Sequence, residues 1–186
     1  MKKTLCNLLG LAFAVCLRAA DEPDRFRNLK WGSGPSDVGE MELLKEETTP
    51  SGEVKNYRKK GEILVFGTAQ LESIEYSFWQ DRLWAIRLEV RGEEAYDALK
   101  ATCTQRFGEA PHASRVVERS IWKGRRTFMV LDFDEVRGNG RLILMSVVIK
   151  EQMDAAKEEK KESEPEAEAG VQGGEQPEPG GGAGAP

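Results

Sequence analysis

The chain has 186 residues and a formal net charge of −5, from 27 Lys and Arg against 32 Asp and Glu, with three cysteines. Its 39% hydrophobic and 32% charged residues exclude a collagen, a coiled coil and a strongly basic nucleic-acid binder. Between a basic N-terminus and an acidic C-terminus, residues 21–150 are long enough for one domain with its own hydrophobic core.

The N-terminus has the pattern of an export signal. Two lysines precede a largely apolar run at residues 5–17, which is short for a membrane-spanning helix and is followed by Arg18 and two alanines. We therefore predict that residues 1–20 are a signal peptide and that the mature chain is periplasmic or secreted. Cys16 partly matches a lipid-attachment site, so we expect membrane contact only if Cys16 is lipidated or the signal stays uncleaved.

The segment 26–91 is predicted to form a helix followed by antiparallel strands. Val38, Met41 and Leu44 recur at helical spacing after a sequence typical of a helix start. Apolar and polar residues then alternate in two runs, which predicts a hairpin with Trp84 on its buried face. In chain order the expected elements are a helix from Ser33-Gly34-Pro35, a strand at 54–59, a turn at Lys60-Gly61, an apolar run at 63–66, and strands at 74–78 and 84–90.

The segment 92–150 is predicted to repeat this order. An apolar stripe at spacings of three and four residues indicates an amphipathic helix at 93–107, and its members are Tyr96, Leu99, Cys103 and Phe107. Strands are expected at 116–122, 126–134 and 141–149, with turns at Lys123-Gly124 and Gly138-Asn139-Gly140. The predicted fold class is α+β, in which two helix-plus-antiparallel-hairpin halves form one sheet with helices on one face.

The C-terminal residues are expected to lie outside this domain, whose predicted range is 21–150. Residues 151–162 are charged and favour a helix that leaves the domain. Residues 163–186 are rich in Gly, Pro and Glu and have almost no apolar side chains, so we predict a disordered tail.

Short motifs along residues 26–149 resemble a group of exported bacterial proteins that have no agreed activity. The motifs are Phe26-Arg27-Asn28-Leu29-Lys30-Trp31-Gly32, Ile74-x-Tyr76-x-Phe78, and Phe107-Gly108-x-x-Pro111. The order of elements is also similar to the β-lactamase-inhibitor-like fold, which is used by small envelope lipoproteins of the outer-membrane assembly machinery and by secreted inhibitors. This resemblance implies a fold, and an envelope or inhibitory role only by analogy.

Few residues offer catalytic or metal-binding chemistry. His112 is the only histidine and has no second ligand at metal-binding spacing, and the sequence has no phosphate-binding glycine loop, so no metal or cofactor is expected. Cys103 lies on the apolar stripe of its helix, which predicts a buried, unreactive thiol. Asp132 and Asp134 alternate on one strand face and are the candidate acid–base pair if the protein is an enzyme.

A binding role is indicated by strand 141–149, which has apolar residues on both faces and therefore needs cover on both. The helix at 93–107 can cover one face. The other face must meet the chain after Lys150, a second copy of the protein, or a foreign partner. Basic clusters at two predicted turns add charge to this surface. The candidate partner surface consists of Leu142, Leu144, Met145, Val148, Arg58, Lys60, Lys123 and Arg125.

The sequence therefore favours an exported, non-catalytic binding or envelope-accessory protein. Its partner is expected to be another envelope protein or a second copy of itself, and not nucleic acid. Two alternatives stay open at this point: a secreted inhibitor of another protein, and an enzyme whose site has no recognisable motif.

Overall fold

The computed structural model describes residues 22–114 and 119–163. The longer strands are β3 (Met41–Thr49), β4 (Gly52–Lys59), β7 (Ser73–Trp79), β8 (Arg82–Arg91), β9 (His112–Ser114), β10 (Arg119–Lys123), β11 (Thr127–Asp134) and β12 (Asn139–Ser146). Two-residue strands form two small ladders, β1 (Arg25–Phe26) with β2 (Leu29–Lys30) and β5 (Val65–Phe66) with β6 (Ala69–Gln70). The helices are the 3₁₀ turn η1 (Pro35–Asp37), α1 (Glu93–Phe107) and α2 (Val147–Ser163).

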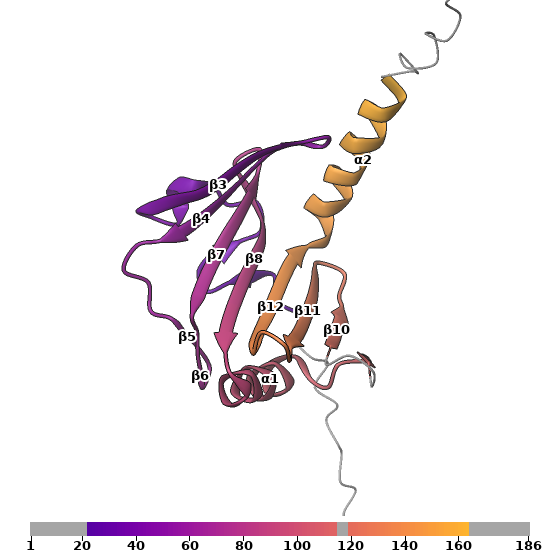
Figure 1. Cartoon of the computed structure of the whole chain (residues 1–186). Helices are drawn as coiled ribbons and strands as arrows, with labels where there is room; N and C mark the ends of the chain where they lie inside the picture. Colours follow the sequence, from indigo (N-terminus) through magenta and orange to yellow (C-terminus); the bar gives the residue numbers. More distant parts are fainter. Residues whose placement is uncertain (1–21, 115–118, 164–186) are drawn as a thin grey trace, which may run out of the picture.

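The main sheet has eight strands in the order β3-β4-β7-β8-β12-β11-β10-β9, and every neighbouring pair is antiparallel (Figure 1). Helix α1 crosses one end of the sheet, and α2 continues from the central strand β12 beyond the opposite end. The predicted α+β class with an antiparallel sheet is confirmed.

The main hydrophobic core lies on the face of the sheet that α1 covers. Strands β7, β8, β11 and β12 each supply alternate side chains to it, and the largest fully buried ones include Tyr76, Phe78, Ile86, Leu88, Leu131, Leu142 and Leu144. Tyr96, Leu99 and Cys103 of α1 are buried against them, as the predicted apolar stripe requires. The bounds of α1 agree with the prediction because Gly92 and Gly108 flank the stripe.

A second, smaller cluster lies on the opposite face, beneath the first turns of α2. It consists of Val54, Trp79, Ile149 and Met153, with Trp84 half-buried at its side. The two helices therefore pack on different faces of the sheet. The predicted arrangement, with one helix from each half on the same face, requires a helix in the first half as well as α1.

The prediction of a helix that begins near Ser33 is wrong. Only the single turn η1 forms, and Gly39, with φ +98°, redirects the chain into β3. Met41 and Leu44 thus become strand residues, because pairing of β3 with β4 along nearly its whole length outweighs a three-residue apolar stripe. Of the two predicted halves, only the second has its α-helix.

Trp84 was predicted on the buried face of its hairpin, but it lies on the other face. The ladder between β7 and β8 shifts register after Ser77, so that Leu83 pairs with Phe78 and Ala85 pairs with Ser77. Trp84 is the extra residue between these pairs. Leu83 takes the core position, and Trp84 packs beside the second cluster.

Strand β12 ends at Ser146, three residues before the predicted end. The pairing of β12 with β8 reaches Ala85. Further along β8, the backbone N–H and C=O of Leu83 already form hydrogen bonds with Ser33 and Gly32. With no partner left on this side, residues 147–149 enter α2 despite their β-branched side chains. Ser146 supports the new helix, because its Oγ accepts a hydrogen bond from the N–H of Ile149 at 3.3 Å.

The predicted signal peptide and nearly all of the predicted tail, residues 1–20 and 164–186, lie outside the described residues, as do residues 116–118 of the strand predicted at 116–122. The charged helix predicted at 151–162 forms the larger part of α2. Within the described ranges no helix is both long and apolar enough to cross a membrane.

Candidate binding face

The sheet face opposite α1, called the open face below, carries an unusual number of apolar side chains between β10 and β12. Met145 pairs with Phe128, and Ile143 pairs with Val130, which in turn pairs with Ile121. All five side chains are half-buried, and none belongs to either core cluster. We call these five residues the apolar strip.

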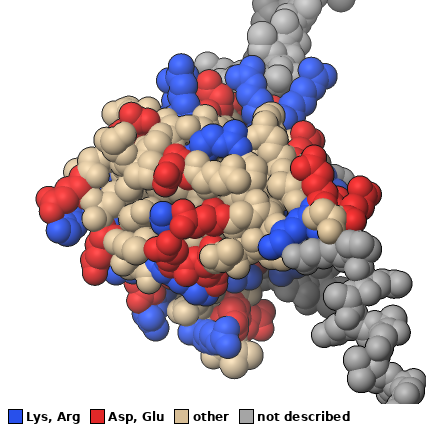
Figure 2. All heavy atoms as spheres, turned by 90° about the horizontal axis from the view of Figure 1, so that it is seen from above, with Lys and Arg blue, Asp and Glu red and all other residues tan. Residues whose placement is uncertain are grey.

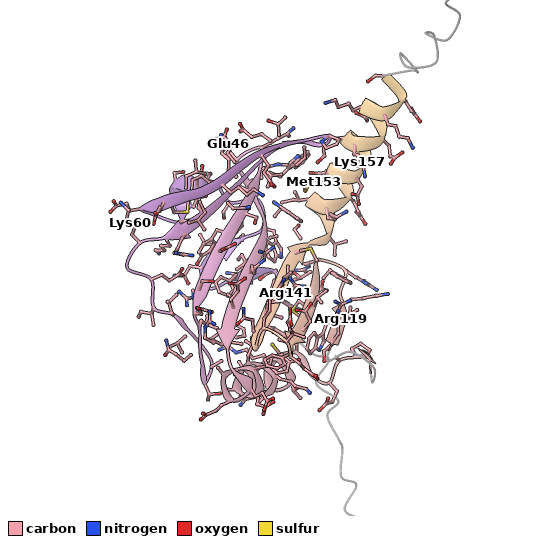
Figure 3. All side chains as sticks on the ribbon, in the orientation of Figure 1. Glu46, Lys60, Arg119, Arg141, Met153 and Lys157 are labelled. Atoms are coloured by element: carbon pink, nitrogen blue, oxygen red, sulfur yellow. The ribbon has the colours of Figure 1, made fainter. Side chains whose placement is uncertain are left out.

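A row of charged residues borders the apolar strip. On each strand that they share, the charged residue lies two positions from a strip residue, on the same face of the sheet. The charged row consists of Glu89 on β8, Arg141 on β12, Asp132 on β11 and Arg119 on β10, which face one another in register. Figure 3 shows Arg119 and Arg141 near each other on this side of the sheet.

Asp132 organises the charged row. Its Oδ1 accepts a hydrogen bond from Nε of Arg141 at 2.7 Å, and its Oδ2 accepts one from Nη2 at 3.0 Å. Nη2 of Arg119 lies 3.6 Å from the same Oδ2. The bond to Asp132 also raises the pKa of the Arg141 guanidinium. This two-bonded geometry fixes the plane of the Arg141 guanidinium.

The arginines of the open face lie outside the carboxylates that pair with them. The side chains of Arg119 and Arg141 are 47% and 49% exposed, whereas that of Asp132 is 12% exposed. Arg87 and Glu75, whose ion pair on β8 and β7 measures 3.8 Å, follow the same arrangement. In these pairs the guanidinium is therefore more accessible to an approaching molecule than the carboxylate that it binds.

Beside the charged row, at the end of the β11–β12 hairpin, the surface has a hollow of about 540 Å³. Its polar lining combines three arginines and four carboxylates with one amide: Arg119, Arg137, Arg141, Glu89, Asp132, Asp134, Glu135 and Asn139. Basic and acidic side chains are also interspersed on the surface seen from above the molecule (Figure 2).

The candidate acid–base pair, Asp132 and Asp134, does not present two free carboxylates. Both oxygens of Asp132 accept bonds from Arg141. Asp134 closes the hairpin turn, because its Oδ1 accepts a hydrogen bond from the N–H of Arg137 at 3.0 Å and the Arg137 side chain lies 3.6 Å from its Oδ2. These contacts assign structural roles to both residues.

Two members of the predicted partner surface, Leu142 and Leu144, are core residues and cannot bind a partner. They are 0% and 1% exposed and lie on the face that α1 covers. Their neighbour Met145 lies on the open face within the apolar strip, and Val148 is 53% exposed at the start of α2.

The predicted basic clusters do not form one surface. Lys60 follows β4, whereas Lys123 ends β10 and Arg125 lies in the turn after it. Four strands separate β4 from β10, and the two run in opposite directions, so these turns lie at opposite ends of the sheet. Lys60 and its neighbour Arg58 are thus remote from Arg119 and Arg141 (Figure 3).

Cys103 is fully buried, and burial raises the pKa of its thiol to about 12, so its predicted unreactive character fits its surroundings. The side chain of His112, the other residue considered for nucleophilic or metal chemistry, lies outside the described part. Among the described side chains no three of the metal-ligating types gather into a metal site.

The chain just after the predicted signal peptide is held on the β10–β11 turn. Oε1 of Glu22 accepts hydrogen bonds from the N–H groups of Arg126 and Thr127, the latter at 2.7 Å. Thr127 Oγ1 donates to the carbonyl of Pro23 and accepts a bond from Trp31 Nε1 at 2.7 Å. Trp31 of the entry motif is therefore tied to the second half of the sheet.

The arginines of the charged row were not among the predicted site residues. Asp132 and Arg141 face each other only if the hairpin turn lies at residues 135–138, which pairs Asp134 with Asn139. The predicted turn at 138–140 gives a different register. The cross-strand pairing of opposite charges was the signal that could have identified this pair.

Comparisons of the chain with protein-family models, curated proteins and solved structures find no match. The fold defines an α+β protein with an antiparallel sheet, and the open face, with its apolar strip and charged row, is the candidate binding surface.

Proposed function

We propose that this protein is an exported, non-catalytic envelope-accessory protein, and that its open face binds another envelope protein. The observation that carries the proposal is the apolar strip, five half-buried side chains that no described element covers. The charged row next to it provides a polar border. An apolar centre with a polar rim is the usual anatomy of a protein–protein interface.

The position of the helices supports this proposal. Helix α1 covers the core face, and α2 packs on the open face through Ile149, Met153 and Ala156 near β4. Its remaining turns leave the sheet (Figure 1), so the charged helix does not fold back over the strip. A partner molecule is then the natural cover for these side chains.

Site-specific photo-crosslinking in intact cells tests the proposal. A photoreactive amino acid at Val130, in the middle of the strip, is expected to form an adduct with one other envelope protein. The same amino acid at Glu94, exposed on α1, is the matched control and is expected to form none. Equal adducts from both positions, or no adduct from Val130, would contradict the proposal. An adduct of two copies of this chain would assign the face to self-association.

A further inference from the structure

The charged row offers a chemical criterion for the partner of the open face. We infer that Arg119 and Arg141 form a receptor for carboxylate side chains, which binds an acidic segment of the partner protein while apolar residues of that segment lie on the apolar strip. This inference rests on the proposed function and specifies the chemistry of the partner.

The geometry of Arg141 leaves part of its guanidinium available. Asp132 occupies Nε and one N–H of Nη2, so both N–H groups of Nη1 and the second of Nη2 remain for an incoming acceptor. Asp132 fixes the plane of this guanidinium before any ligand arrives. A donor group that is already oriented loses less side-chain entropy on binding.

Arg119 supplies the second half of the receptor. Its Nη2 is 3.6 Å from Oδ2 of Asp132, close enough for electrostatic attraction but longer than a good hydrogen bond. Arg119 and Arg141 therefore flank one nearly buried carboxylate and are both about half exposed. The planar fork of a guanidinium matches a carboxylate through paired N–H bonds, and two such groups lie side by side here.

The surroundings favour a segment with both acidic and apolar residues. The apolar strip lies directly beside the receptor, because Ile143 is two residues from Arg141 and Val130 is two residues from Asp132 on the same strand faces. A free anion would use the arginines but leave the strip uncovered. An acidic segment that carries apolar side chains contacts both.

The composition of residues 164–186 argues for a partner segment over the acidic C-terminus of this chain. The hollow lies at the Asn139 end of β12, and α2 begins at the other end of that strand (Figure 1). The 23 residues after Ser163 are long enough to return to the hollow, since an extended chain spans up to about 3.4 Å per residue, but they contain one Val and no Leu, Ile, Met or aromatic residue that could lie on the apolar strip.

A defined peptide tests the receptor directly on the mature full chain. The probe is a capped ten-residue peptide in which Glu alternates with Val, and the comparison peptide has Gln in place of Glu. Calorimetry is expected to detect binding of the Glu peptide, and the Arg119 and Arg141 side-chain NMR signals are expected to shift. The Gln peptide is expected to bind at least about tenfold more weakly, because each bond to a charged group contributes roughly that factor.

Variants then assign the binding to the two arginines. Arg119→Gln leaves Asp132 paired with Arg141, and Arg141→Lys keeps the charge but removes the planar fork, so both variants are expected to fold. Each is expected to bind the Glu peptide about tenfold more weakly than the wild type. Arg58→Gln, at an exposed arginine of β4, is the matched control and is expected to bind as the wild type does.

Three results would overturn the inference: equal binding of the Glu and Gln peptides, no Glu-peptide binding, or unchanged binding by the Arg119 and Arg141 variants. Tenfold tighter binding by a chain that ends at Ser163 would assign the receptor to the C-terminal segment of this chain, and would also overturn it. Crosslinking from Val130 that persists alongside a failed peptide test would leave the proposed function intact and reject only the receptor.

Discussion

Asp132 lies nearly buried between two arginines, and both of its oxygens accept hydrogen bonds from Arg141. Sequence position alone makes Asp132 look like one half of an acid–base pair. Its contacts make it a residue that orients guanidinium groups on the open face. The chemical role of a carboxylate thus depends on the strand that lies next to it, here β12.

We predict that Asp132→Asn lowers the free energy of unfolding by about 1–3 kcal/mol, because two charged hydrogen bonds become weaker and both arginines lose their counter-ion. Urea unfolding measures this change. The double variant Asp132→Asn/Arg141→Gln is expected to lose less than the sum of the two single variants. Additive losses would show that the pair is not coupled.

Cys103 gives a second prediction at this scale. Cys103→Ser is expected to destabilise the protein by about 1–3 kcal/mol, because a buried hydroxyl replaces a small apolar group. In the native wild type, a thiol reagent is expected to label Cys103 only as fast as the protein opens. Immediate labelling in native buffer would contradict its burial on α1.

Glu22 gives the protein an acid-sensitive contact. Burial alone would raise the pKa of Glu22, but backbone N–H groups of Arg126 and Thr127 bond its carboxylate, and the net effect lowers the pKa below 4.5. Its stabilising contribution is therefore complete above that value and is lost as the pH falls through the lower, folded-state pKa. We expect Glu22→Gln to show a smaller loss of stability than the wild type between roughly pH 5 and pH 3. Identical urea-midpoint profiles would contradict this assignment.

At the scale of elements, α1 is held closely on β12 at Gly140. A Cβ atom at this position would lie 2.6 Å from Cδ2 of Tyr96 and 2.8 Å from Cγ2 of Val90. We predict that Gly140→Ala costs about 1–3 kcal/mol, because a methyl group has no space between the helix and the strand. Glu135→Ala, in the exposed turn before β12, is the control and is expected to change the urea midpoint little. A neutral Gly140→Ala would mean that α1 is not packed this closely.

The elements that the sequence predicts well are those decided by neighbours along the chain. Helix α1 was predicted with its observed bounds because a four-residue stripe and two glycines agree. The failures were decided by distant contacts. The segment after Ser33 forms no α-helix because β3 pairs with β4. Strand β12 ends early because Gly32 and Ser33 occupy the backbone hydrogen-bonding groups of Leu83 on β8. Periodicity within a short window contains no information about such contacts.

The candidate site was predictable only in part for the same reason. That a second face of strand 141–149 needs cover, from the chain after Lys150, a second copy or a foreign partner, follows from its apolar pattern. Which residues occupy that face depends on strand register, and a small error in the turn before Asn139 hides the pairing of Asp132 with Arg141. The apolar strip also combines three strands, and the two-faced apolar pattern identifies only β12 among them.

At the scale of the whole molecule, the two faces of the sheet carry different side chains. The face under α1 carries the main hydrophobic core, and the open face carries the smaller cluster under α2, the apolar strip and the charged row. Separation of this kind lets substitutions on the open face change binding with little effect on folding. Val130, at the centre of the strip, is the residue where this separation is most easily tested.

The most direct test is the affinity of the crosslinked partner, once purified, for the wild type and for Val130→Asp. The substitution is expected to cost no more than about 1 kcal/mol of stability, since it lies on the solvent side of the sheet. The account predicts that Val130→Asp raises the Kd by about 30-fold or more, the effect of removing a central interface residue. A Kd within about threefold of the wild type, with the protein folded, would show that the partner does not bind the open face.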